Sequence, residues 1–368
     1  MTVEDVARII ESWAPRWIAW EKDNVGLQVG DPTRRVKRIL VALDVTHEVV
    51  REAVAEKADL IVSHHPLLFR PPSTITTSDE IGKLVLRLAE KKIAVYAAHT
   101  NLDFTKDGVS YQLARKLDLE NIRFLLPLKG LLSKIVVFVP TQQADALAEA
   151  MAHAGAGIIG EYDLCSFRTE GTGTFRGSAR TKPAVGKAGR FEKVSETRLE
   201  MIAPRARVNA IVEAMKSAHP YEEAAYDIYD VENPSPNYGS GAMGELSNEM
   251  TLGQFLKKAK TALQAESLRV AGSTKEKVKR IAVCGGSGSD LLPVAIKAKA
   301  DVFVTADVRY HTFHAAQGKI ALIDAGHWET EHVILEPLKQ RILSALKRGE
   351  DRIDVFVTKH STNPIHSV

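Results

Sequence analysis

The stretch ADLIVSHHP (58–66) runs from a short apolar segment directly into two adjacent histidines and a proline. Similar segments lie on either side of it, RILVALDV (38–45) and KIAVYAAHT (92–100), and amphipathic segments of helical period separate the three. Continuous apolar strands that alternate with such helices are typical of right-handed β-α-β units with a mainly parallel sheet covered on both faces. The stretch therefore predicts an α/β fold.

The same order of segments returns near the carboxyl end. Three pairs align by eye, the third after one deletion: RILVALDVT (38–46) with RIAVCGGSG (280–288), ADLIVSHHP (58–66) with ADVFVTADV (300–308), and AAHTNLD (97–103) with AGHWETE (325–331). We therefore expect duplicated α/β units with mainly parallel sheets.

A segment of different character separates the two halves. It contains the expected strands LSKIVVFVP (132–140), RLEMIAP (198–204) and AAYDIYDV (224–231), and the expected helices QADALAEAMAHAG (143–155) and RVNAIVEAMKSA (207–218). Its ends are rich in Pro, Gly, Ser and Asn, as linkers usually are. We expect an inserted α+β domain at 127–246, flanked by the two halves of the outer domain at 1–126 and 247–368.

Imidazole and carboxylate side chains follow several of the apolar strands. Ligands of open α/β sheets bind beyond the carboxyl ends of the strands, and such side chains, without thiolates, suit zinc, iron or manganese in sites with open positions. The candidates are too many for one tetrahedral catalytic ion, so we expect two divalent ions. They are His64, His65, Asp103, His327 and Glu331.

The two histidines can converge only if the strand ends where they begin, because successive side chains of a strand point to opposite faces. Pro66 cannot donate a ladder hydrogen bond, and it restricts His65 to an extended or turn conformation. We expect a turn that lets both rings reach the metals.

Three further residues near these strand ends have open roles. His99 is a candidate to orient Asp103. Asp307 and His311, in TADVRYHTFHAA (305–316), have two readings: contact with substrate or a ligand, or simple capping of a helix.

Other motifs predict structure rather than chemistry. GSGAMG (239–244) lacks a preceding strand, so we read it as a linker. CGGSGSD (284–290) predicts a tight turn close to the site, with anion binding by its backbone amides as the alternative. HPYEE (219–223) contains potential ligands, but its place in the inserted module favours a structural turn. TVED (2–5) predicts a capping box at the first helix.

Composition excludes several classes of protein. The formal charge of +3 comes from 49 basic and 46 acidic side chains without long blocks, so it predicts neither a nucleic-acid footprint nor a membrane surface. Cys165 and Cys284 lie far apart, which fits a reducing cytoplasm. The amino terminus does not read as a signal peptide, and no apolar run approaches the ~20 residues that span a bilayer.

Taken together, the motifs resemble those of the Nif-three-like family, many of whose bacterial members are called GTP cyclohydrolase I type 2 homologue. The resemblance covers nearly the whole chain. It is seen in DNVGLQVG (23–30), ALDVT (42–46), SHHPLLF (63–69), AHTNLD (98–103), TADVRYH (305–311) and GHWETE (326–331).

This resemblance implies a ring-shaped homohexamer, a trimer of dimers, with the metals facing an inner cavity. It matches His64, His65, Asp103, His327 and Glu331 to the family's metal ligands one by one. It also implies that the insertion is the PII/CutA-like domain of the longer bacterial members.

Two functions follow as hypotheses. The first is a metal-dependent hydrolase, of which GTP ring opening is one case, with Glu329 or His99 as the proton shuttle. The second is a non-catalytic regulatory or scaffold protein, in which the metals brace the halves and the insertion receives a small-molecule effector or a partner.

Overall fold

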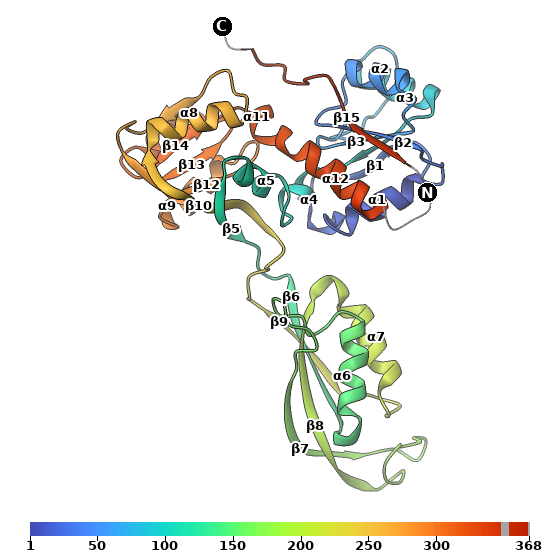
Figure 1. The fold of residues 1–368 in the computed structure, drawn as a ribbon. Helices are drawn as coiled ribbons and strands as arrows, with labels where there is room; N and C mark the ends of the chain where they lie inside the picture. Colours follow the sequence, from blue (N-terminus) through green and yellow to red (C-terminus); the bar gives the residue numbers. More distant parts are fainter. Residues whose placement is uncertain (347–352, 367–368) are drawn as a thin grey trace. The chain divides into compact units, whose positions relative to one another are not determined.

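A computed structural model describes residues 1–346 and 353–366 of the chain. The chain divides into two compact units (Figure 1). The outer unit contains Met1–Leu126 and Asn237–Val368, and the inserted unit contains Pro127–Pro236. Within the described ranges, none of the helices combines the length and the apolar character that crossing a membrane requires.

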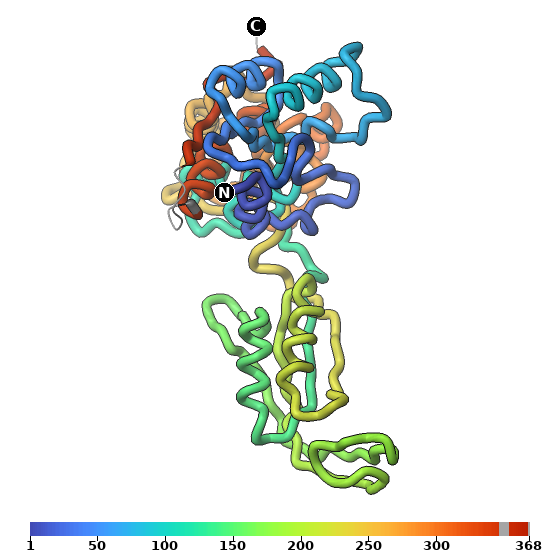
Figure 2. The backbone as a smooth tube through the Cα atoms, turned by 90° about the vertical axis from the view of Figure 1, so that its right-hand side faces the viewer, coloured from blue at the N-terminus to red at the C-terminus, as the bar shows by residue number. Residues whose placement is uncertain are grey.

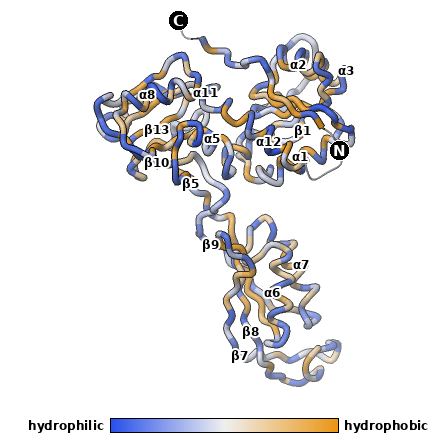
Figure 3. Tube along the Cα trace, viewed as in Figure 1, coloured by the Kyte–Doolittle hydropathy of each residue, from blue (hydrophilic) through white to orange (hydrophobic). Residues whose placement is uncertain are grey.

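The first sheet of the outer unit is mainly parallel, as expected. Its strands, in the spatial order β1-β4-β3-β2-β15, are β1 (Gly26–Val29), β4 (Ala94–Ala97), β3 (Leu60–Ser63), β2 (Arg38–Ala42) and β15 (Asp354–Val357). Only β1 pairs antiparallel, with β4, whereas β15, β2, β3 and β4 are parallel to one another. Figure 3 shows hydrophobic residues along these strands.

Helices cover both faces of this sheet, because each strand is apolar on both sides. One face packs on α2 (His47–Ala55) and α3 (Glu80–Lys91). The other packs on α1 (Val3–Glu11) and α12 (Leu335–Leu346). Helix α1 begins with the expected capping box, since the Asp5 backbone N–H donates to Thr2 Oγ1 and the Thr2 N–H donates to the Asp5 carboxylate.

The second sheet is mixed, which corrects the expectation that both sheets are mainly parallel. Strands β12, β13 and β14 are parallel, but β10 pairs antiparallel with β12 and β11 antiparallel with β14. Its strands, in the order β11-β14-β13-β12-β10-β5, are β11 (Arg269–Ala271), β14 (Ala321–Asp324), β13 (Val302–Thr305), β12 (Lys277–Val283), β10 (Gly239–Thr251) and β5 (Leu119–Pro127).

This second sheet also lies between two helical layers. Helices α5 (Val109–Lys116) and α8 (Leu252–Ala262) contribute to the core on one face. Helices α9 (Leu292–Lys297) and α10 (Tyr310–Ala316) contribute to the core on the other. Across both units, short 3-10 helices lie at Arg16–Ile18, Thr141–Gln143, Arg205–Arg207, Ser289–Leu291 and His332–Ile334.

The strand registers agree with the sequence duplication. Ile39 of β2 lies opposite Leu60 of β3, and the aligned residue Ile281 of β12 lies opposite Val302 of β13. Both sheets also add an antiparallel strand beside the third strand, β1 against β4 and β11 against β14. The outer unit therefore repeats one strand arrangement in its two halves.

The segment GSGAMG (239–244) is not the linker that the sequence suggested, because it forms the start of β10. Its glycines permit close strand packing: a Cβ on Gly239 would lie 2.5 Å from Phe124 Cγ, and one on Gly244 would lie 2.8 Å from the Glu120 carbonyl oxygen. Residues 237–246 therefore belong to the outer unit, although we expected the insertion to extend to 246.

The inserted unit is a four-stranded antiparallel sheet with two helices on one face. Its elements follow the order β-α-β-β-α-β, and α6 and α7 lie side by side (Figure 2). They are β6 (Leu132–Pro140), α6 (Ala144–His153), β7 (Phe167–Arg176), β8 (Phe191–Pro204), α7 (Val208–Ala218) and β9 (Tyr226–Val231), with the strands in the order β7-β8-β6-β9. The sequence did not predict β7, because its exposed Gly and Thr residues lack apolar alternation.

The inserted unit has its own core of buried residues from β6, β8 and both helices, so we expect residues 127–236 to fold when expressed alone. Circular dichroism of this fragment should show cooperative thermal unfolding. Met215→Ala, which empties a fully buried position, should lower its free energy of unfolding by about 2 to 5 kcal/mol. A fragment without cooperative unfolding would contradict this expectation.

Candidate metal centre

The polar cluster lies just beyond the carboxyl ends of strands from both sheets of the outer unit. Strand β3 ends at Ser63, directly before His64 and His65, as the proline turn predicted. His99 follows β4 and precedes α4 (Thr100–Asp103), and His327 and Glu331 are the ends of α11 (His327–Glu331). The tertiary structure thus brings candidate metal-ligand side chains from the two halves of the chain together.

Four imidazoles share one mode of orientation, in which Nδ1 is held by an oxygen and Nε2 is left for another partner. A fixed Nδ1 partner sets the ring orientation and makes Nε2 the available ligand atom. The four Nδ1 pairs are His64 with the Ala98 carbonyl oxygen (2.8 Å), His65 with Asp44 (2.7 Å), His99 with Asp23 (3.0 Å) and His327 with Asp307 (2.6 Å).

The buried carboxylate of Glu331 lies next to three of these rings. Its Oε2 is 3.0 Å from His65 Nε2 and 3.1 Å from His327 Nε2, and its Oε1 is 3.8 Å from His64 Nε2. Asp103 Oδ1 lies 3.6 Å from the same His64 Nε2. All five residues that the sequence selected as metal ligands therefore meet here.

Three buried atoms of this cluster have no hydrogen-bond partner among the described residues: His64 Nε2, Asp103 Oδ1 and Glu331 Oε2. For Glu331 Oε2, the two contacts with histidine are at ion-pair distance but do not have hydrogen-bond geometry. Buried polar atoms are nearly always paired, because an unpaired one costs free energy. A metal ion would satisfy all three, so the residues fit the group that the sequence predicted.

Two sets of three residues place their ligand atoms within 4.8 Å of one another, His64 with His65 and His99, and His65 with His327 and Glu331. These sets can hold a metal ion. Imidazole and carboxylate donors without thiolate accept zinc, iron and manganese. His99 thus joins the possible ligands, whereas the sequence analysis assigned it to orient Asp103 or to move a proton.

Proton affinities in the cluster show how strongly its charges interact. Burial would lower the pKa of His65, but the hydrogen bond to Asp44 and the adjacent negative charge of Glu331 outweigh it and raise that pKa to about 10. The adjacent carboxylate of Glu331 raises the pKa of His327 to about 9. Burial would raise the pKa of Glu331, but its histidine partners hold it well below the usual value. The imidazoles and the buried carboxylate therefore stabilise one another's charged forms.

Gly286 makes room for the cluster. The segment CGGSGSD (284–290) forms the turn that the sequence predicted, and Gly286 adopts φ +60° in it. A Cβ at this position would lie 2.1 Å from Glu331 Oε1 and 3.2 Å from His327 Nε2. Glycine therefore meets both the backbone conformation and the space requirement of the site.

The structure separates the roles that the sequence left open. Asp307 orients His327 and does not cap α10, whose N-cap residue is Arg309. His311 is exposed on α10 with its ring against Tyr310, and it lies outside both sets of metal-binding residues. Glu329 lines a pocket of about 300 Å³ next to His327, together with Asp307 and Arg269. This pocket therefore lies beside the cluster, at His327.

Sequence reasoning missed two orienting carboxylates. Asp44 follows β2 in the same parallel sheet as His65, so the strand-end rule could have identified it. Asp23 precedes the antiparallel strand β1, and no local pattern connects it to His99. Hydrogen bonds to His99 and Thr100 outweigh burial and lower the pKa of Asp23 to about 2, so it stays ionised.

The carboxyl-terminal segment contacts residues of both halves next to the cluster. Thr362 Oγ1 donates to Asp44 Oδ2, and Asn363 Nδ2 donates to Glu329 Oε1 at 2.9 Å. This segment thereby supports the orienting partner of His65 and holds Glu329 beside the pocket.

The chain is similar to known proteins over nearly its whole length. The model of the family Duf34/NIF3 (NGG1p interacting factor 3) matches residues 1–364. Proteins called GTP cyclohydrolase 1 type 2 homolog from Halalkalibacterium halodurans and Bacillus subtilis are 39% and 38% identical, each match covering 98% of this chain and 97% of the relative. The crystal structure of a Bacillus cereus protein related to NIF3 has a TM-score of 0.87 at 37% identity and covers 100% of this chain and 99% of that chain.

The Gly286 geometry gives a test with a matched control. Gly286→Ala and Gly318→Ala both place alanine at positive φ, but nothing lies within 4 Å of a Cβ at Gly318. Both should lower the free energy of unfolding by about 1 to 2 kcal/mol. Only Gly286→Ala should weaken zinc or manganese binding, by at least about tenfold, in competition with a chelating dye. Equal metal affinity in the two variants would exclude this role for Gly286.

Asp44 gives a second test, because it holds the ring of His65 without being a candidate ligand itself. Asp44→Ala should weaken metal binding by about 10- to 100-fold. Asp44→Asn keeps a hydrogen-bond acceptor for His65 Nδ1, so its loss of metal affinity should be smaller. The exposed Glu48→Ala, in α2, serves as the control and should bind metal normally. The dye competition measures all three, and full affinity in Asp44→Ala would show that His65 needs no such partner.

Proposed function

Because the chain belongs to the Duf34/NIF3 family, we propose that it is a dinuclear metal-binding protein and a metal-dependent hydrolase of the GTP cyclohydrolase 1 type 2 homolog kind. The observation that supports this most directly is the convergence of three unpaired buried atoms, on His64, Asp103 and Glu331, among four oriented imidazoles. A purely structural cluster would pair these atoms within the protein.

In this proposal His64, His65, Asp103, His327 and Glu331 hold two divalent ions, which are zinc, iron or manganese. Glu331 is suited to be the shared ligand, since its two oxygens face different histidines. Bound ions would polarise a substrate oxygen and lower the pKa of a water ligand. His65 and His327 would bind through Nε2, because Asp44 and Asp307 hold their Nδ1 atoms.

Proton transfer would fall to Glu329 or His99. Glu329 lines the pocket beside His327, and Asn363 fixes one of its oxygens. His99 is half-buried, packs edge-on against the rings of His64 and His65, and is held by Asp23. Each can thus reach a water or leaving group at the cluster from a defined direction.

We further propose that the chain forms a hexameric ring, a trimer of dimers, and that the inserted unit is a PII/CutA-like module. The β-α-β-β-α-β order of the inserted unit supports the second proposal. The first proposal rests on the family resemblance; Trp20 and Phe69 of the outer unit are 64% and 50% exposed and are available for contacts between chains. Both cysteines are free thiols, which suits the cytoplasm.

The decisive experiment measures metal and turnover on the same samples. Protein purified without chelators should contain about two ions per chain by elemental analysis and release formate from GTP. His65→Ala and Glu331→Ala should lose both properties while keeping the secondary structure seen by circular dichroism. Glu329→Gln should keep its metal and lose about 10²- to 10⁴-fold in rate, if Glu329 is the proton shuttle.

Other outcomes would redirect the proposal. Two ions without GTP turnover would keep the metal centre and move the search to other hydrolysable substrates. Turnover that survives metal removal would refute the hydrolase proposal. A metal-free protein that loses its assembly, with no turnover on a substrate panel, would favour a regulatory or scaffold protein, for which the pocket in the inserted unit offers a ligand site.

A further inference from the structure

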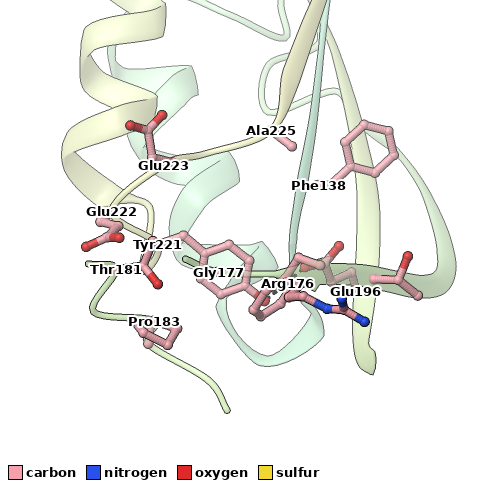
Figure 4. A pocket seen from close by; sticks show the side chains of 13 residues that line it. Phe138, Arg176, Gly177, Thr181, Pro183, Glu196, Tyr221, Glu222, Glu223 and Ala225 are labelled. Carbon is pink, nitrogen blue, oxygen red and sulfur yellow. Dashed lines mark hydrogen bonds between the residues drawn. The ribbon is translucent and has the colours of Figure 1, made fainter. Parts of the chain in front are cut away.

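The inserted unit contains a pocket of about 260 Å³ that belongs to this unit alone (Figure 4). Strands β6, β7 and β8 contribute to it, together with the segment after β7 and the turn that follows α7. Its size suits a small metabolite rather than a large ligand.

Three aromatic rings line this pocket: Phe138, Phe175 and Tyr221. Phe175 and Tyr221 contact each other with ring centroids 5.9 Å apart. Pro183 and Ala184 extend the apolar lining. Such walls bind an apolar body, and aromatic faces also attract cations.

Glu196 is the charged group buried in the pocket, with only 8% of its surface exposed. The Tyr221 hydroxyl donates to its Oε1 at 2.9 Å. Among the residues that the structure describes, no cation lies at ion-pair distance from this carboxylate. A buried carboxylate with a single neutral donor is costly, so this carboxylate is suited to a cationic partner.

Gly173 of β7 provides the space in which this carboxylate lies. A Cβ on Gly173 would be 1.9 Å from Glu196 Oε2. Gly171, two residues earlier and directly opposite Glu196 in the strand pairing, has nothing within 4 Å of its would-be Cβ. The two glycines therefore differ in whether a side chain would displace Glu196.

The motif HPYEE (219–223) positions the other side of the pocket. Both ring nitrogens of His219 are used within the unit, Nε2 with the Phe138 carbonyl oxygen and Nδ1 as acceptor from the Tyr221 N–H. His219 therefore has the structural role that the sequence suggested, and it holds Tyr221 against Glu196. Glu222 and Glu223 lie at the rim, so acidic groups outnumber the guanidinium of Arg176 around the pocket.

We infer that this pocket binds a small organic cation, an amine with an apolar or aromatic body, whose ammonium group pairs with Glu196 while its body packs on Phe138, Phe175 and Tyr221. This site is independent of the metal centre and of the hydrolase proposal. It assigns the inserted unit a ligand of defined chemistry, as a sensor of amines would need.

A charge series tests the chemistry on the full-length protein. Phenethylamine, phenethyl alcohol and phenylacetate share one aromatic body but are cationic, neutral and anionic. Isothermal titration should show saturable binding of the amine, at least about tenfold tighter than either analogue. Binding of phenylacetate as tight as that of the amine, or no saturable binding of the amine, would overturn the inference.

Variants locate the binding in this pocket. Glu196→Gln and Gly173→Ala should each weaken phenethylamine binding by at least about tenfold, because one removes the charge and the other displaces it. Gly171→Ala and the exposed Glu170→Gln are the matched controls and should bind normally. Glu331→Ala should also bind normally, which separates this site from the metal centre. Unchanged binding in both Glu196→Gln and Gly173→Ala would overturn the inference, and each variant's melting curve shows whether it is folded.

Discussion

The buried carboxylate of Glu331 is the group around which the candidate metal ligands of the outer unit are arranged. Its oxygens face His64 and His65 from the first half of the chain and His327 from the second. A carboxylate in this position requires positive charge, from protonated imidazoles or from metal ions, because an uncompensated buried charge is strongly unfavourable. The buried charge of Glu331 is therefore compensated by side chains from both halves of the outer unit.

Duplication explains why both halves supply such side chains, but the two halves do not contribute equally. The last of the three repeated parallel strands in each half is followed by a histidine, His99 after β4 and His327 after β14. The strand registers make Ala97 at the end of β4 equivalent to Asp324 at the end of β14. Ala98 alone separates Ala97 from His99, whereas Ala325 and Gly326, the latter at φ +92°, separate Asp324 from His327. The histidines also take different partners, Asp23 for His99 and Asp307 for His327.

The inserted unit also contains a buried carboxylate whose charge needs compensation, in a different fold. Glu196 is a buried carboxylate seated against a glycine, as Glu331 is seated against Gly286. Glu331 has several imidazoles around it, whereas Glu196 has one tyrosine hydroxyl. The nitrogen and oxygen atoms around Glu331 suit a metal ion, which needs directional ligands. The aromatic faces around Glu196 suit an organic cation.

The sequence alone determined the apolar strands, their duplication, the inserted module and the five candidate ligands, since strand period, turn chemistry and the strand-end rule all act within a few residues. Only the tertiary structure decided which atoms converge. It paired His99 with Asp23 and His65 with Asp44, placed GSGAMG in a strand, and added the polar strand β7. These features depend on contacts between segments that are distant in sequence. The residues that stabilise them are neighbours in space only, so no local sequence pattern specifies them.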